Sequence, residues 1–157
     1  MQIDLNDFYR RVKDTRAIVL NWLDTLPEGV FTREHPDFAF GSLCGIYSHI
    51  AKCYLVWVGN VGLGLPRPNL QVTSVAELRE VFAQVDQVVQ QALERFEGQD
   101  GPIHWTDASG EPCTFSRHWL ILHPITHEFH HKGQALALAR ILGHPHPGNP
   151  DTDLVAP

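Results

Sequence analysis

Four long segments of the sequence repeat apolar side chains at intervals of three and four residues, with glycine- and proline-containing stretches between them. This interval places the apolar side chains along one face of an α-helix. The pattern predicts helices over residues 5–26, 43–57, 74–98 and 116–142. Such helices bury their apolar faces against one another, so we expect an all-α fold, a four-helix bundle. The loops over 27–41 and 59–73 are long enough for a crossover connection.

Local signals refine the ends of these helices. Ser74 and Glu77 form a capping box at the start of the third helix, and Gly98 ends it. The three glycines and two prolines of residues 59–69 should end the second helix. Residues 98–115 place three large apolar side chains around the turn-forming sequence DASG, so we expect a small β-hairpin before the last helix.

The chain has the size of one domain, with 157 residues. We therefore expect a single domain over residues 1–157, in which the proline-rich residues 143–157 form an extended tail. Pro124 lies inside the last predicted helix. Because proline lacks an N–H and crowds the preceding turn, Pro124 should either kink this helix or mark the start of its regular part.

The charge balance and the apolar segments exclude several classes of partner. Twelve lysines and arginines against eighteen acidic residues give a net charge of −6, and no basic cluster offers a surface for nucleic acid. No stretch approaches the ~20 apolar residues of a membrane-spanning helix. The first residues lack the apolar core of a secretory signal, and three cysteines without a CxxC spacing suit a reducing compartment. We expect a cytoplasmic protein that binds neither nucleic acid nor membrane.

Histidine is the unusual residue, since seven of the ten lie between His118 and His146. At about 100° per residue, His123, His127 and His131 fall within an arc of about 80° on the last helix, together with several apolar side chains. Glu128, Lys132 and Arg140 point elsewhere. We therefore expect the three imidazoles to lie on the buried face and the charged side chains on the solvated face.

This stack of imidazoles predicts a metal site. Buried imidazoles need partners for both ring nitrogens, and a divalent cation supplies one partner to several rings at once. Histidines four residues apart on a helix can bind the same ion. A third ligand should come from another helix, and His49 on the second helix is the candidate. A polar core without metal is the alternative. Cys53, one turn after His49, is interpreted as core packing.

These residues carry a resemblance to a known family. His49 in the context SHIAKCYLVW and the downstream string H-x3-H-x-G-Q, which begins at His127, resemble the DinB/YfiT superfamily of bacterial four-helix bundles. The resemblance extends from the first helix to Thr152–Leu154, with Lys132 in place of a frequent arginine. It implies a divalent metal ion, such as Zn, Ni or Fe, bound by His49, His127 and His131. It also implies a homodimer and, as in some relatives, chemistry on low-molecular-weight thiols such as bacillithiol or mycothiol.

Two other metal motifs overlap the same string. The residues from His127 to His131 also spell H-E-x-x-H, the zinc protease signature, in which Glu128 would be the general base. The metzincin extension fails, because Gln134 and Ala137 stand where it requires glycine and histidine, and no glutamate follows Glu128. A di-iron site would need a second E-x-x-H, which is absent from the sequence.

The function expected from these residues is metal-dependent chemistry on a small molecule. Three neutral imidazoles preserve the charge of the ion and leave a coordination position open, as in catalytic sites. We expect transfer onto a thiol first and hydrolysis second, and the alternative is a metal-binding stress protein without turnover. Further residues that could support the site are His123, Glu128, His130 and Gln134.

Overall fold

The helices begin where a short polar side chain can accept hydrogen bonds from free backbone N–H groups. Asp4, Ser42, Ser74 and Ser116 each accept at least one such bond from the first turn of the helix that follows. The computed structural model describes residues 3–99, 101–148 and 153–155. Its elements are α1 (Leu5–Leu23), α2 (Leu43–Tyr54), the π-helical η1 (Leu55–Gly62), α3 (Val75–Phe96), β1 (Ile103–Thr106), β2 (Pro112–Phe115) and α4 (Arg117–Ile141).

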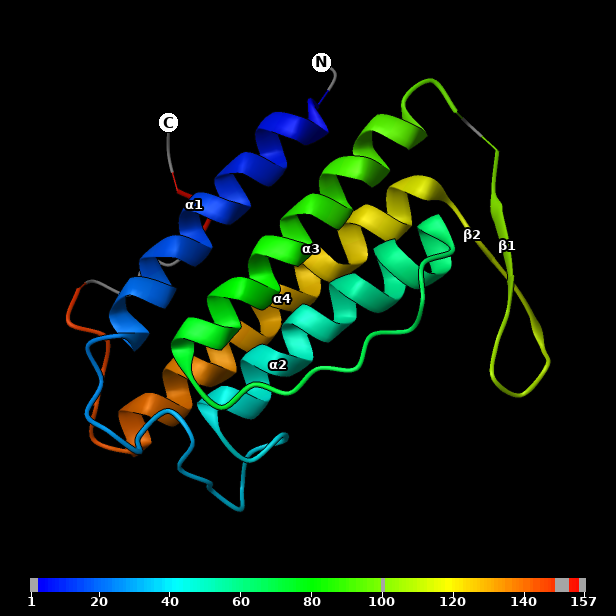
Figure 1. The fold of residues 1–157 in the computed structure, drawn as a ribbon. Coiled ribbons are helices and arrows are strands. Elements are labelled where there is room, and N and C mark those ends of the chain that lie inside the picture. The colour runs from blue at the N-terminus through cyan, green and yellow to red at the C-terminus, as the bar shows by residue number, and fades with distance from the viewer. Residues whose placement is uncertain (1–2, 100, 149–152, 156–157) are drawn as a thin grey trace.

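The four α-helices pack side by side as a bundle with one crossover (Figure 1). The segment from η1 to α3 runs back along the length of the bundle, so α2 and α3 point the same way and α1 and α4 point the opposite way. The helix α2 packs against both α3 and α4, whereas α1 packs mainly against α3. This arrangement confirms the predicted all-α bundle and its crossover.

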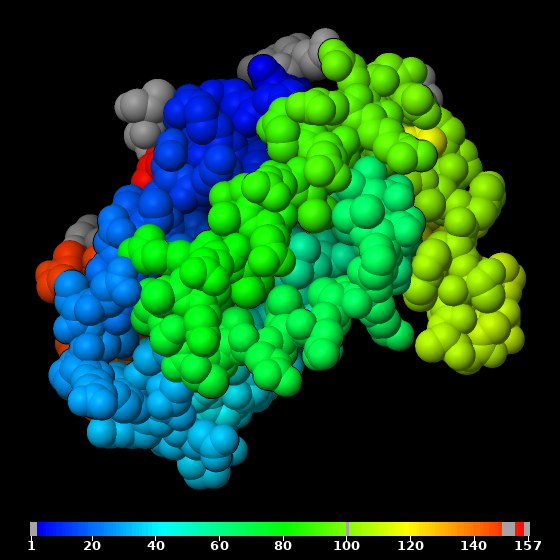
Figure 2. Space-filling model, viewed as in Figure 1, coloured from blue at the N-terminus to red at the C-terminus, as the bar shows by residue number. Residues whose placement is uncertain are grey.

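The hairpin before α4 is also confirmed. The strands β1 and β2 pair antiparallel, with Ile103 opposite Phe115 and Trp105 opposite Cys113. The hairpin projects from the bundle as a separate lobe (Figure 2). Trp57 of η1 packs edge-on against Phe115, with ring centroids 5.3 Å apart, which ties the hairpin to the end of the second helix.

The prediction that glycines end the second helix near residue 57 is wrong. Helical structure continues through the π-helix to Gly62. A Cβ at Gly59 would lie 3.3 Å from Cγ1 of Val88, and one at Gly62 would lie 3.2 Å from Cζ of Phe96. These glycines therefore let the helix approach α3 closely, and close packing offsets their low helix propensity.

A buried polar network occupies the centre of the bundle. Arg16 of α1 donates from Nε and Nη2 to the two carboxylate oxygens of Glu128 in α4, at 2.8 and 2.9 Å. Its Nη1 donates to Asp86 of α3 at 2.8 Å, and the Tyr54 hydroxyl of α2 donates to Glu128 at 2.6 Å. The Tyr9 hydroxyl completes the network by donating to Asp86. All four helices therefore meet in one set of charge-assisted hydrogen bonds.

The prediction of a solvated charged face on α4 is wrong for two residues. Glu128 is 3% exposed and Lys132 is 5% exposed, so both lie on the buried face with Ile121 and Ala135. His131 is buried as well, whereas His123 and His127 are partly exposed. Hydrophobic periodicity misplaced the face because Arg16 neutralises Glu128 inside the core, and a buried charge looks like a surface charge in a sequence.

Two described residues near the end of the chain contact α1. His146 packs edge-on against Trp22 at 5.1 Å, and the Val155 N–H donates to the Thr15 hydroxyl at 3.1 Å. Thr152, which the family resemblance includes, lies outside the described residues. The extent of the domain and of its tail to residue 157 stays a prediction. Within the described residues, no helix is both long enough and apolar enough to cross a bilayer.

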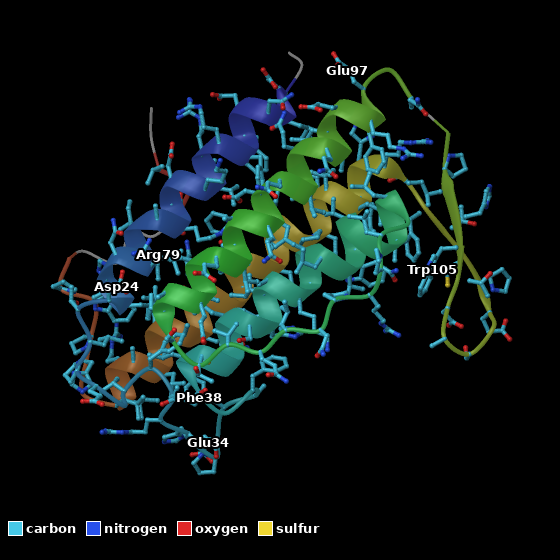
Figure 3. The ribbon with its side chains drawn as sticks, viewed as in Figure 1. Asp24, Glu34, Phe38, Arg79, Glu97 and Trp105 are labelled. Carbon is cyan, nitrogen blue, oxygen red and sulfur yellow. The ribbon has the colours of Figure 1, made fainter. Side chains whose placement is uncertain are left out.

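We predict that Glu128→Gln lowers the free energy of unfolding by about 3–5 kcal/mol, because the substitution leaves the buried Arg16 without its bidentate partner. Urea denaturation monitored by circular dichroism measures this loss. The matched control is Arg79→Gln, which breaks the exposed pair that Arg79 and Asp24 form between α3 and α1 (Figure 3). It should cost less than about 1 kcal/mol. Equal losses in the two variants would contradict a structural role for the buried network.

Candidate metal centre

Three histidines from α2 and α4 converge at one point. One ring nitrogen from each of His49, His127 and His131 lies within 4.8 Å of the other two. The Nε2 atoms of His49 and His127 are 2.7 Å apart. The two helices bring together residues separated by 78 positions because α2 packs along α4 over most of its length. The structure therefore brings together the three side chains that the sequence analysis proposed as metal ligands, and their role as ligands stays a prediction.

Gln134 orients one of the three rings. Nδ1 of His131 lies 2.7 Å from Oε1 of Gln134, and an amide oxygen can only accept, so Nδ1 carries the proton. The Nε2 of His131 is then the nitrogen with a free lone pair. The amide nitrogen of Gln134 lies 3.3 Å from Nε2 of His130, the exposed neighbour. Gln134 thus acts as the orienting group that many metal-binding histidines have.

Phe40 covers the cluster from the loop before α2, and the sequence analysis missed it. Its ring stacks on His49 at 3.9 Å and meets His131 edge-on at 5.5 Å. Phe40 has a φ of 68°, a conformation that non-glycine residues rarely adopt. A Cβ at Gly45 would collide with the carbonyl oxygen of Phe40, so the glycine allows the loop to lie on the first turn of α2. In the sequence, the only indication of this close contact between the loop and α2 is the pair of glycines Gly41 and Gly45.

The environment favours the neutral form of His49 and His127. Burial, together with the neighbouring His131 and His49, lowers the pKa of His127 to about 4. Burial, together with His131 and Lys52, also lowers the pKa of His49. Neutral imidazole is the form that binds a metal, so at neutral pH the protein does not have to lose protons from these two rings to do so.

The other predicted residues lie in three different places. His123, one turn before His127, stacks on Trp119 with ring centroids 4.4 Å apart. His130 is exposed and contacts Gln134. The carboxylate of Glu128 is held by Arg16 and Tyr54, and no hydrogen bond in the described residues joins it to a histidine. No contact among the described residues therefore supports a role for Glu128 at the histidine site.

The donor set fits a divalent cation. Zinc binds histidine nitrogen at ~2.0–2.1 Å, and nitrogens a few ångströms apart can share one such ion. His49 and His127 are partly exposed and His131 is buried, so the cluster reaches the surface on one side. Two cavities, of about 1110 and 280 Å³, are lined by none of the three histidines. The arrangement can therefore hold an ion with one side partly exposed.

Comparison with known proteins agrees with the sequence resemblance. The family model described as the DinB family matches residues 1–154. A search of curated proteins finds no match to the chain.

We predict that lower pH destabilises the metal-free protein partly through His127. In the unfolded chain this group takes up its proton near pH 6.5, whereas in the folded protein it does so only near pH 4. Between these values the unfolded state binds more protons, so the free energy of unfolding falls as the pH falls through this window. Urea denaturation in EDTA should show a smaller fall for His127→Gln than for the original protein. An unchanged pH dependence in this variant would contradict the lowered pKa, and the exposed His104→Gln is the control.

We predict that Gln134→Leu weakens zinc binding by about 10–100-fold, because the variant loses the acceptor that orients His131. Competition with a chromogenic chelator measures the affinity. The exposed Gln90→Leu on α3 is the matched control and should bind zinc like the original protein. Equal affinities in Gln134→Leu and Gln90→Leu would show that this hydrogen bond does not support the site.

Proposed function

The chain belongs to the DinB family, and on that premise we propose that it is a divalent-metal-dependent enzyme that activates a low-molecular-weight thiol for transfer to a small electrophile. The second possibility at the same site is activation of water, which would make the protein a hydrolase. The ion would be Zn, Ni or Fe, since imidazole nitrogen suits all three.

One observation carries this proposal, the meeting of His49, His127 and His131 at a partly exposed point. Three neutral nitrogen ligands leave the full positive charge of the ion available, and three protein ligands are typical of catalytic rather than structural zinc sites. When bound, the ion supplies Lewis acidity, which lowers the pKa of a thiol or water molecule next to it.

The side chains of this protein have separate tasks in the proposed reaction. The three histidines hold the ion, and Gln134 keeps the His131 ring in the orientation that presents Nε2. The Phe40 ring shields His49 and His131 from water on one side. In the transfer, the thiol gives its proton to solvent, its sulfur bonds to the electrophilic atom of the substrate, and the leaving group departs with the electron pair of the bond that breaks.

The position of Glu128 favours this reaction over the protease alternative. In an H-E-x-x-H protease the glutamate acts as a base on the water next to the metal. Here both oxygens of the Glu128 carboxylate accept hydrogen bonds from Arg16, and one accepts a further bond from Tyr54. A carboxylate held in this way serves the stability of the bundle.

A metal-binding protein without turnover is the second candidate. The same three histidine ligands would serve such a protein, because holding an ion requires no substrate. A substrate for the enzyme would have to bind at the partly exposed side, beside His49 and His127. The small-molecule substrate, the homodimer and the cytoplasmic location remain predictions that rest on the sequence.

The test begins with elemental analysis of protein purified without chelator or affinity tag. We expect close to one divalent ion per chain, and loss of that ion in His49→Ala and His131→Ala. A panel of thiols and electrophiles should then give metal-dependent conjugation that both variants lose. The exposed His118→Ala should keep both the metal and the activity.

The variant Glu128→Gln separates the alternatives, provided it is assayed at a temperature at which it stays folded. Thiol transfer should persist in it, because Glu128 has no part in the chemistry proposed. If activity survives in His49→Ala but is lost in Glu128→Gln, the protein would instead be a zinc protease of the H-E-x-x-H type. Bound metal without turnover of any thiol or water substrate would favour the non-catalytic protein.

A further inference from the structure

A second group of metal-binding side chains lies next to the three histidines. The Sγ atom of Cys53 and one ring nitrogen each of His123 and His127 all lie within 4.8 Å of one another. Cys53 is on α2, one turn after His49, and His123 is on α4, one turn before His127. The second group is thus the first group displaced by one helical turn along both helices, with His127 common to the two.

Two members of this second group differ from the third, His127, whose Nε2 lies 2.7 Å from Nε2 of His49. In the part of the chain that the structure describes, neither Cys53 Sγ nor the His123 ring makes a side-chain hydrogen bond. The other buried cysteine differs, because Sγ of Cys44 donates to the Val72 carbonyl at 3.1 Å. An imidazole without a hydrogen-bond partner in a partly buried position costs free energy unless water or an ion satisfies it.

Aromatic side chains hold His123 in the position that this group requires. Its ring stacks on Trp119 at 4.4 Å with an angle of 10°, and the edge of Trp57 meets it at 5.4 Å. These contacts restrict the ring to one orientation, beside Cys53 and His127. A ligand whose orientation is fixed in advance loses less conformational entropy when it binds an ion.

We propose that Cys53, His123 and His127 form a second cation position that takes a strongly thiophilic ion, of the class of Cd²⁺ and Cu⁺. This position goes beyond the proposed function, because it does not depend on turnover at the three-histidine site. Thiolate selects soft ions, whereas a site of three imidazoles suits Ni²⁺ or Fe²⁺ equally well. On binding, Cys53 forms a sulfur–metal bond and its thiol proton leaves to the buffer.

The shared histidine makes the two positions exclusive. A neutral imidazole has one nitrogen with a free lone pair, because the other carries the proton. His127 can therefore serve one ion at a time, either with His49 and His131 or with Cys53 and His123. The chain binds a single ion, and the softness of that ion decides which position it occupies.

The test compares Cd²⁺ with Ni²⁺, each added alone to the metal-free full-length chain. Ultraviolet absorption reports a cadmium–thiolate bond, and equilibrium dialysis gives the stoichiometry and the affinity. We expect one Cd²⁺ per chain with a thiolate band, and one Ni²⁺ per chain without one. Cys53→Ser should lose the band and bind Cd²⁺ at least tenfold more weakly, while its Ni²⁺ affinity stays unchanged. His131→Ala should show the reverse, with Ni²⁺ binding lost and the cadmium band kept.

Matched variants separate Cys53 from the other cysteines and from general damage to the fold. Cys44→Ser, at an equally buried cysteine, and Cys113→Ser, on the hairpin, should both keep the band. His123→Phe preserves an aromatic ring against Trp119 and should lose Cd²⁺ affinity like Cys53→Ser. A thiolate band that persists in Cys53→Ser, no band in the original protein, or two ions bound at once would each overturn the proposal. If the original protein does not bind Ni²⁺, this result would instead count against the three-histidine site.

Discussion

A buried arginine determines how the four helices face one another. Arg16 of α1 binds Glu128 of α4 through two hydrogen bonds and Asp86 of α3 through a third, and Tyr54 of α2 donates to the same Glu128. Directional bonds of this kind restrict the rotation of a helix more tightly than apolar contacts do, because apolar packing has little directionality. With Glu128 turned towards Arg16 of α1, the position before it on α4, His127, is rotated by about 100° and meets His49 of α2. The metal centre therefore depends on the polar core.

A column of rings runs along α4 beside α2. Trp119, His123, His127 and His131 follow one another at four-residue intervals, and neighbouring ring centroids are 4.2 to 5.6 Å apart. On α2, Cys53 follows His49 by one turn, so each pair of successive histidines in the column has one potential ligand opposite it. A repeat of one helical turn on two adjacent helices produces overlapping ligand sets without any special loop. The two sets then differ in the ligand from α2, which is the nitrogen of His49 in one set and the sulfur of Cys53 in the other. This difference decides which ions each set prefers.

Several features of the fold could be predicted from local signals. The caps at Ser74 and Ser116 and the hairpin before α4 depend on residues within a few positions of one another, so the local sequence contains the information needed. The errors concern long-range partners. Glu128 was assigned to the solvated face because its counter-ion, Arg16, lies 112 residues away. The glycines after Trp57 were interpreted as helix breakers because the α3 side chains that fill the space beside them are not visible in the local pattern.

For the candidate site, the sequence alone determined that His127 and His131 share one side of a helix, since the geometry of the α-helix places residues four positions apart above one another. The sequence also offered His49 on the second helix as their candidate partner, and the family resemblance implied the same three ligands. Only the tertiary structure decided that Phe40 covers these rings, that Gln134 orients His131, and that Cys53 lies within reach of His123. Those contacts depend on the rotation of α4 against α2 and on the path of the loop before α2. Both are set by side chains distant in the chain, which no local periodicity encodes.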